Sequence, residues 1–187
     1  QIEDILSKYC SDDRFYHEIE HIVNMLDELK LMAGKLNLSI EDYCALRLAI
    51  WYHDIVYNLQ NKDGSKNEDN ELHSALYFIN KIQKSGILAE EFCGKVSDLI
   101  KFTDHKHKSL STLGQILVDL DLIIFGQSAE VFDQYDQNIR KEYHFVPEIT
   151  YLEARKNILQ RFANKENIYY TSHFRNKYEN IAKQNLS

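Results

Sequence analysis

The sequence predicts an all-α protein, on two observations. Residues that break helices are scarce, because 6 Gly and 1 Pro contribute only 7 of 187 residues. Sheet sandwiches and barrels need many tight turns, which these residues supply for steric reasons. Apolar residues also recur three and four positions apart along most of the chain, as they do on one face of a helix. We therefore expect about eight helices in one domain that spans residues 1–187.

Each expected helix is a segment with helical periodicity. The first ends near Gly34, and the second opens where Ser39 and Asp42 have the spacing of a capping box. A polar stretch around Gly64 predicts the loop that follows, over residues 58–67. The expected helices cover residues 13–33, 39–57, 68–84, 89–102, 110–125, 128–143, 148–164 and 173–185.

Glycine, proline and polar residues predict the boundaries of the later helices. The third helix stops before Gly86, and the fifth stops at Gly126. Residues 104–109, rich in Lys and His, are expected to form the loop between the fourth and fifth helices. Pro147 lies where the first turn of the seventh helix accepts a proline.

Charge and cysteine content exclude several classes of protein. The formal net charge is −7, which disfavours binding to nucleic acids by broad phosphate neutralisation but allows a small phosphorylated substrate. Cys10, Cys44 and Cys93 lack metal-site spacing and are odd in number, so we expect a cytoplasmic protein without disulfides. Apolar runs fall short of the roughly 18 residues of a membrane span, so no membrane association is expected. Oligomeric state is left open.

Ionisable residues among apolar neighbours mark the candidate site. On a helix, residues three and four apart are neighbours, so His53 and Asp54 would both lie against apolar side chains such as Ile50. In the fifth helix all such neighbours of Asp121 are apolar, whereas Asp119 has Gln115 beside it. Buried carboxylates need a partner or a cation. Imidazole and carboxylate together suit divalent metals.

The first expected helix adds His17 and His21, four residues apart on one face. The stretch from His17 to His21 matches H-E-x-x-H, the helix of zinc proteases, with Glu41 as a possible third ligand. That interpretation leaves His53, Asp54 and Asp121 unexplained, so a protease is the least favoured alternative.

A second interpretation uses all of these residues. The order of His21, His53-Asp54 and Asp121 resembles the H…HD…D arrangement of the HD-domain superfamily of metal-dependent phosphohydrolases, in particular a branch of small proteins known only as predicted HD phosphohydrolases. The matching stretches cover nearly the whole chain. They are Arg14-Phe-Tyr-His17-x-x-x-His21-Ile22, Ala49-Ile-Trp-Tyr-His53-Asp54-Ile-Val-Tyr57, Asn70-Glu71-x-x-Ser74-Ala75, Val118-Asp-Leu-Asp121-Leu-Ile-Ile-Phe-Gly126, Ile139-Arg140-Lys-Glu142-Tyr143-x-x-Val146-Pro147, Arg155-x-x-Ile-Leu159 and Tyr178-Glu179-x-x-Ala182-x-x-Asn185-Leu186.

The resemblance implies a single HD-type domain, with a metal-binding core over residues 13–126 and helices over 128–187 that pack on it. It implies His21, His53, Asp54 and Asp121 as ligands of a divalent ion, with Asp119 as a rival for the last position. The ligand types accept Mn, Fe, Co, Zn or Mg. One ion or two are both compatible with the sequence.

Further residues are expected to act on the substrate. Asp54 can orient or deprotonate the attacking water, and His17 is expected in the active site without binding metal. Glu71 is expected to orient water or to bind a second metal. A guanidinium matches phosphate bidentately, so Arg14 and Arg140 are candidates for phosphate recognition.

One histidine of residues 104–109 is expected to join the site. His105 is preferred over His107, because the branch carries a histidine shortly after a threonine there.

The expected activity is hydrolysis of a phosphate ester in a small metabolite, with a nucleotide as the favoured substrate. Alarmone hydrolases of the superfamily carry an acidic pair one turn after the HD pair, where this chain has Val56, Tyr57 and Asn58, so specific alarmone hydrolysis is not expected. The motif ending in glycine that marks cyclic-dinucleotide phosphodiesterases is also missing after Asp54. The alternative is a non-catalytic HD fold that senses a nucleotide.

Overall fold

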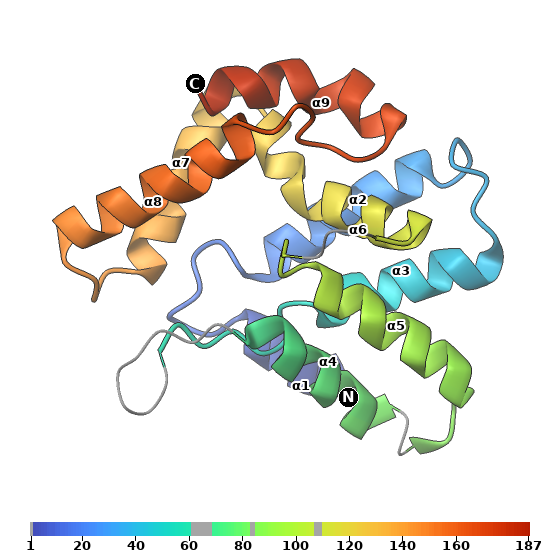
Figure 1. The fold of residues 1–187 in the computed structure, drawn as a ribbon. Coiled ribbons are helices and arrows are strands. Elements are labelled where there is room, and N and C mark those ends of the chain that lie inside the picture. Colours follow the sequence, from blue (N-terminus) through green and yellow to red (C-terminus); the bar gives the residue numbers. More distant parts are fainter. Residues whose placement is uncertain (1, 61–68, 83–84, 107–109) are drawn as a thin grey trace. The chain divides into compact units, whose positions relative to one another are not determined.

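A computed structural model of the protein describes residues 2–60, 69–82, 85–106 and 110–187 (Figure 1). Within these ranges the protein consists of nine α-helices and a 3₁₀ helix, η2, without a β-strand, which confirms the all-α prediction. The helices are α1 Ile2–Tyr9, α2 Ile19–Met32, α3 Ile40–Tyr52, α4 Asn70–Ile82, α5 Glu90–Phe102, α6 Thr112–Asp121, η2 Leu122–Gly126, α7 Ala129–Glu142, α8 Glu148–Ala163 and α9 Ser172–Asn185.

The chain separates into two compact units. The first unit comprises Gln1–Ser11 and His17–Val118, and the second comprises Asp12–Tyr16 and Asp119–Ser187. The boundary falls inside α6, upstream of the limit at residue 126 that the sequence suggests for the core. The prediction of one domain over the whole chain stays a prediction.

In the first unit, α5 packs against both α3 and α4, and α3 also packs against α2 (Figure 1). The helices meet through fully buried apolar side chains, including Leu46 and Ile50 of α3, Phe78 of α4 and Ile100 of α5. Burial of this apolar surface is the main force that holds such helices together. The packing fixes the ends of α2 and α3, where the candidate site lies.

In the second unit, η2 packs against α7 and α9. Its Phe125 ring meets Phe162 of α8 edge-on at 5.1 Å between centroids. At Gly126, a Cβ atom would come within 2.5 Å of the Cβ of Tyr178, closer than real carbon atoms approach. Glycine is therefore required where η2 meets α9, and the predicted stop at Gly126 is confirmed.

The N-terminal region differs from the prediction. The structure has an additional helix, α1, and α2 begins at Ile19 instead of residue 13. Segment Asp12–Tyr16 belongs to the second unit. There the backbone N–H groups of Phe15 and Tyr16 donate to Glu142 at 2.9 and 2.8 Å. These two bonds hold the segment in the second unit, and α2 begins only after it.

The second predicted helix is confirmed at its start and too long at its end. The Ser39 hydroxyl accepts from the N–H of Asp42 at 3.0 Å, as the capping box requires. The same hydroxyl donates to the Asp42 carboxylate at 2.8 Å. However, α3 ends at Tyr52 instead of residue 57, so His53 and Asp54 occupy the turn that follows the helix.

Two smaller boundaries also differ from the sequence prediction. The fifth predicted helix divides, because α6 ends at Asp121 and η2 continues to Gly126. Pro147 is the N-cap of α8 and precedes its first turn. None of the helices in the described ranges has the length and apolar character needed to cross a lipid bilayer.

Candidate metal centre

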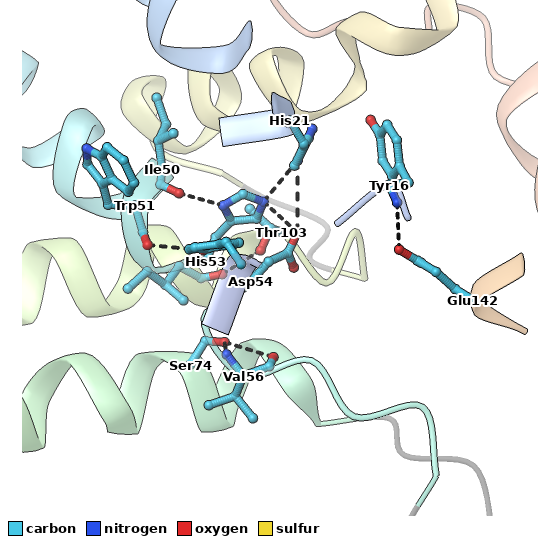
Figure 2. A network of polar contacts seen from close by, with 12 residues as sticks. Tyr16, His21, Ile50, Trp51, His53, Asp54, Val56, Ser74, Thr103 and Glu142 are labelled. Carbon is cyan, nitrogen blue, oxygen red and sulfur yellow. Dashed lines mark hydrogen bonds and ion pairs between the residues drawn. The ribbon is translucent and has the colours of Figure 1, made fainter. Parts of the chain in front are cut away.

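Three buried ionisable side chains of the first unit converge at the ends of α2 and α3. The His53 Nε2 atom lies 3.3 Å from His21 Nε2 and 2.9 Å from Asp54 Oδ2, and His21 Nε2 lies 3.9 Å from the same carboxylate oxygen (Figure 2). His21 belongs to the first turn of α2, while His53 and Asp54 follow α3. The exposed fraction of the residue surface is 5% for His21, 1% for His53 and 8% for Asp54.

The orientation of His53 is fixed by the other side of its ring. Its Nδ1 atom lies 2.9 Å from the carbonyl oxygen of Ile50 (Figure 2). A carbonyl oxygen only accepts, so Nδ1 must carry a proton and donate. Neutral His53 then has its lone pair on Nε2, which faces His21 and Asp54. Histidines that bind metals use this arrangement, with one ring nitrogen donating to a carbonyl and the other facing the ion.

The donor set fits a divalent cation. The Nε2 lone pair of His53 and the Asp54 oxygen are both acceptors, so a proton or a cation must lie between them. Two imidazole nitrogens bound to one tetrahedral zinc ion are separated by about 3.3 Å, given metal–nitrogen bonds of about 2.0 Å. The observed separation between His21 and His53 has this value. Nitrogen and carboxylate oxygen also suit manganese, iron and cobalt.

The segment after α3 is held to α4 by two polar side chains. Ser74 accepts from the N–H of Val56 at 3.1 Å and donates to its carbonyl oxygen at 3.2 Å (Figure 2). Asn70 bonds in the same two-sided way to Asn58, at 2.9 and 3.0 Å. These contacts explain why Asn70 and Ser74 accompany the His-Asp pair. They hold the backbone beyond Asp54 outside the helix.

His17 lies near the converging residues, although not as predicted. It precedes α2, so His17 and His21 do not share a helix face, and the H-E-x-x-H stretch does not form the helix of a zinc protease. Instead, the His17 ring stacks on Tyr57, with centroids 4.1 Å apart and planes at 28°. It also meets His21 edge-on at 6.2 Å. Tyr57, to which no role was assigned from the sequence, therefore positions His17.

Glu71 lies in the first turn of α4, in the electrostatic field of the candidate site. Burial raises the pKa of Glu71 above its ordinary value, and the negative charges of Asp54 and Asp104 add to the shift. Its own backbone N–H and the charge of Lys106 oppose the shift. The charge of Asp54 thus acts on Glu71, whereas the role of Glu71 in orienting water or binding a second metal stays a prediction.

His105 follows α5 in the left-handed region, with φ of 55°. Histidine is one of the residues that adopt this conformation more often than most. Its N–H donates to the carbonyl of Phe102 at 3.3 Å, which ends the helix. The position is structurally defined, whereas a role in substrate binding stays a prediction. His107 lies outside the described residues.

The two aspartates of α6 have the opposite burial from the one expected. Asp119 is fully buried and Asp121 is only half-buried, so Asp121 is not the carboxylate most enclosed by apolar neighbours. The Asp119 oxygens accept from the N–H groups of Tyr170 and Thr171 at 2.7 and 2.8 Å. Burial raises the pKa of Asp119 to about 6, although these two hydrogen bonds oppose the shift. Asp119 therefore has a structural task within the second unit.

The remaining predicted residues, Arg14 and Arg140, also belong to the second unit, as does Asp121. Arg14 is buried, with 8% of its surface exposed. The Arg140 guanidinium donates to the carbonyl oxygens of Tyr143 and Val146 at 2.6 and 3.2 Å. Those bonds satisfy carbonyl groups beyond the end of α7, so part of the donor capacity of Arg140 is already used by its own unit.

In comparisons with known proteins, no family model, no curated protein and no solved structure matches the chain. The resemblance of the sequence motifs to the HD-domain superfamily therefore stays a prediction.

Proposed function

We propose that the protein is a metal-dependent hydrolase of a phosphate ester in a small metabolite, with a nucleotide as the favoured substrate. The single observation that supports it is the convergence of His21 Nε2, His53 Nε2 and Asp54 Oδ2 in a buried position of the first unit. Buried acceptors without a proton or a cation among them would cost free energy.

In this proposal, His21, His53 and Asp54 hold the ion. Asp121 is retained as a fourth ligand because of its place in the motif order, and its role is a matter for experiment. A divalent ion in such a site supplies Lewis acidity, which polarises a phosphoryl oxygen and makes water more acidic.

The protein's own groups orient the reaction. Asp54 offers a second carboxylate oxygen that can accept a proton from water. Glu71 has a raised pKa and faces the charge of Asp54, so it is suited to hold and return a proton. His17, stacked on Tyr57, offers an imidazole whose ring meets that of His21 edge-on.

Metal content tests the first half of the proposal. Purified protein would be loaded with Mn²⁺, Co²⁺ or Zn²⁺, desalted and subjected to elemental analysis, beside His53→Ala and a control, His144→Ala, at an exposed position. We expect about one ion or more in the wild type and the control, and none in His53→Ala. A wild type that retains no divalent metal after any loading would show that His53 and Asp54 form only a buried ion pair.

A substrate screen tests the second half. Nucleoside mono-, di- and triphosphates and simple phosphomonoesters would be incubated with protein loaded with Mn²⁺, Co²⁺ or Mg²⁺, and phosphate release measured. Turnover that disappears in His53→Ala supports hydrolysis. Metal binding and nucleotide binding without any turnover would instead support the nucleotide sensor.

A further inference from the structure

A second cluster of ionisable side chains lies in the second unit, on one face of α8. Tyr151 and Arg155 are one turn apart, and only 6% and 9% of them is exposed. The Tyr151 hydroxyl and the Arg155 Nη2 atom are buried, and no group in the described part of the chain forms a hydrogen bond with either. Buried donors of this kind are rare, because an unmade hydrogen bond costs free energy.

The rest of the Arg155 guanidinium is firmly held. Its Nε atom donates to Asp136 at 2.8 Å, and its carbon lies 4.9 Å from the centre of the Tyr135 ring. Burial works against the charge, but Tyr135 and Asp136 outweigh it and raise the pKa of Arg155. Arg155 therefore remains charged and cannot rotate freely to find another acceptor.

The cluster has neighbouring charges of both signs, and its unsatisfied atoms are donors. The Arg140 guanidinium lies 4.7 Å from the centre of the Tyr151 ring, so two positive groups adjoin the cluster. The negative groups that act on it are Asp136, already bound to Arg155 Nε, and Asp121, whose charge acts on Tyr135. The unsatisfied atoms are a guanidinium N–H group and a phenolic hydroxyl. Such atoms complement a ligand that offers oxygen acceptors.

We propose that Tyr151 and Arg155 form a binding site for a small oxyanion of the phosphate class. The side chain of Arg140, which is half-exposed and covers one face of Tyr151, is the group that moves aside to admit it. Arg155 replaces Arg140 as the better phosphate contact, since Arg140 already serves two carbonyl groups. This inference does not depend on the proposed metal chemistry.

The test measures the melting temperature in EDTA, with inorganic phosphate or chloride at equal ionic strength. We expect phosphate to raise the melting temperature of the wild type in a saturable way. Tyr151→Phe removes one hydroxyl and should weaken the effect roughly 10-fold or more, since hydrogen bonds to charged groups have about this strength. Arg155→Gln should abolish it. Tyr170→Phe and Arg161→Gln, both at exposed positions of the same unit, are the controls.

The Tyr151→Phe variant also guards against a misfolded Arg155→Gln. If phosphate stabilises the wild type no more than chloride does, the proposal is overturned, whatever the melting temperature of Tyr151→Phe. A phosphomonoester, compared with inorganic phosphate in the same assay, identifies the source of the anion. A larger effect of the ester indicates a metabolite, whereas a larger effect of inorganic phosphate indicates the free ion. Metal content is left out of this assay, so failure of the metal proposal cannot mimic either result.

Discussion

Buried or half-buried carboxylates occur in both units, and the groups that face them differ. In the second unit, Asp119, Glu142 and Glu179 each accept hydrogen bonds from the N–H groups of two consecutive residues. In the first unit, Asp54 faces the imidazole nitrogens of His53 and His21.

The difference lies in what each partner can donate. A backbone N–H is a permanent donor, so two of them satisfy a buried carboxylate and fix a loop. A neutral imidazole nitrogen whose ring proton is used elsewhere has only a lone pair. The Asp54 cluster consequently needs a shared proton or a cation, whereas the carboxylates of the second unit that accept from backbone N–H groups need neither. Burial alone does not distinguish a metal site from a structural carboxylate, but the type of partner does.

The largest expected effect is on metal affinity in the first unit. Asp54→Ala should lower it by more than the roughly 10- to 100-fold typical of losing a group that only orients a ligand. Isothermal titration with Mn²⁺ or Zn²⁺ measures the change, and Asp98→Ala, an exposed carboxylate of α5, serves as the control. Equal affinity in both variants would mean that Asp54 is another structural carboxylate.

In the second unit, loss of the Asp119 carboxylate should lower stability and leave metal affinity unchanged. Asp119→Ala leaves two N–H groups in the buried segment without an acceptor and should lower the free energy of unfolding by roughly 2 to 4 kcal/mol. Urea denaturation measures this loss, with Asp133→Ala at an exposed position as the control. The protein that remains folded should bind metal as the wild type does. Loss of metal without loss of stability would identify Asp119 as the last ligand, in place of Asp121.

Two glycines allow a comparison of packing in the two units. Gly126→Ala would overlap Tyr178, so we expect a loss of about 1 to 3 kcal/mol in stability from overpacking. Gly94→Ala, inside α5, meets no atom within 4 Å. That change should raise stability by about 0.5 to 1 kcal/mol, because alanine favours the helix. Thermal denaturation should therefore give shifts of opposite sign, and a neutral Gly126→Ala would contradict the close approach of η2 and α9.

The smallest effect is expected at the start of α3, away from the histidines. Ser39→Ala removes the N-cap and should cost about 1 kcal/mol, whereas Ser39→Asp keeps an acceptor and should cost less. Metal affinity should be unchanged in both. A drop in affinity would show that the cap, through α3, also positions His53.

The helices followed from local chemistry, and the errors occurred where another segment intervened. The cap at Ser39 and the stop at Gly126 depend on neighbouring residues, so they were predictable. The start of α2 was not, because Glu142, far along the chain, holds Phe15 and Tyr16 in the second unit. Likewise, Ser74 holds Val56 outside α3, and the spacing of apolar residues does not predict this contact.

The candidate site was likewise predicted from the sequence only in part. The pairing of His53 with Asp54, and the presence of His21 in the motif order, came from the sequence alone. Their distances, the proton on His53 Nδ1 and the stacking of His17 on Tyr57 depended on packing. Arg155 and Tyr151 lie four residues apart on α8, and no role was predicted for either. Only burial showed that their donors lack partners.

The sequence by itself determined that the chain is helical and which imidazole and carboxylate groups it contains, because helical periodicity and side-chain chemistry are local properties. Tertiary structure decided which carboxylate accepts from backbone N–H groups and which faces histidine. Asp119 is buried by a segment some 50 residues away, which its neighbours in α6 do not reveal. The partner of a buried charge is chosen by long-range packing, and that choice separates a structural carboxylate from a candidate metal ligand.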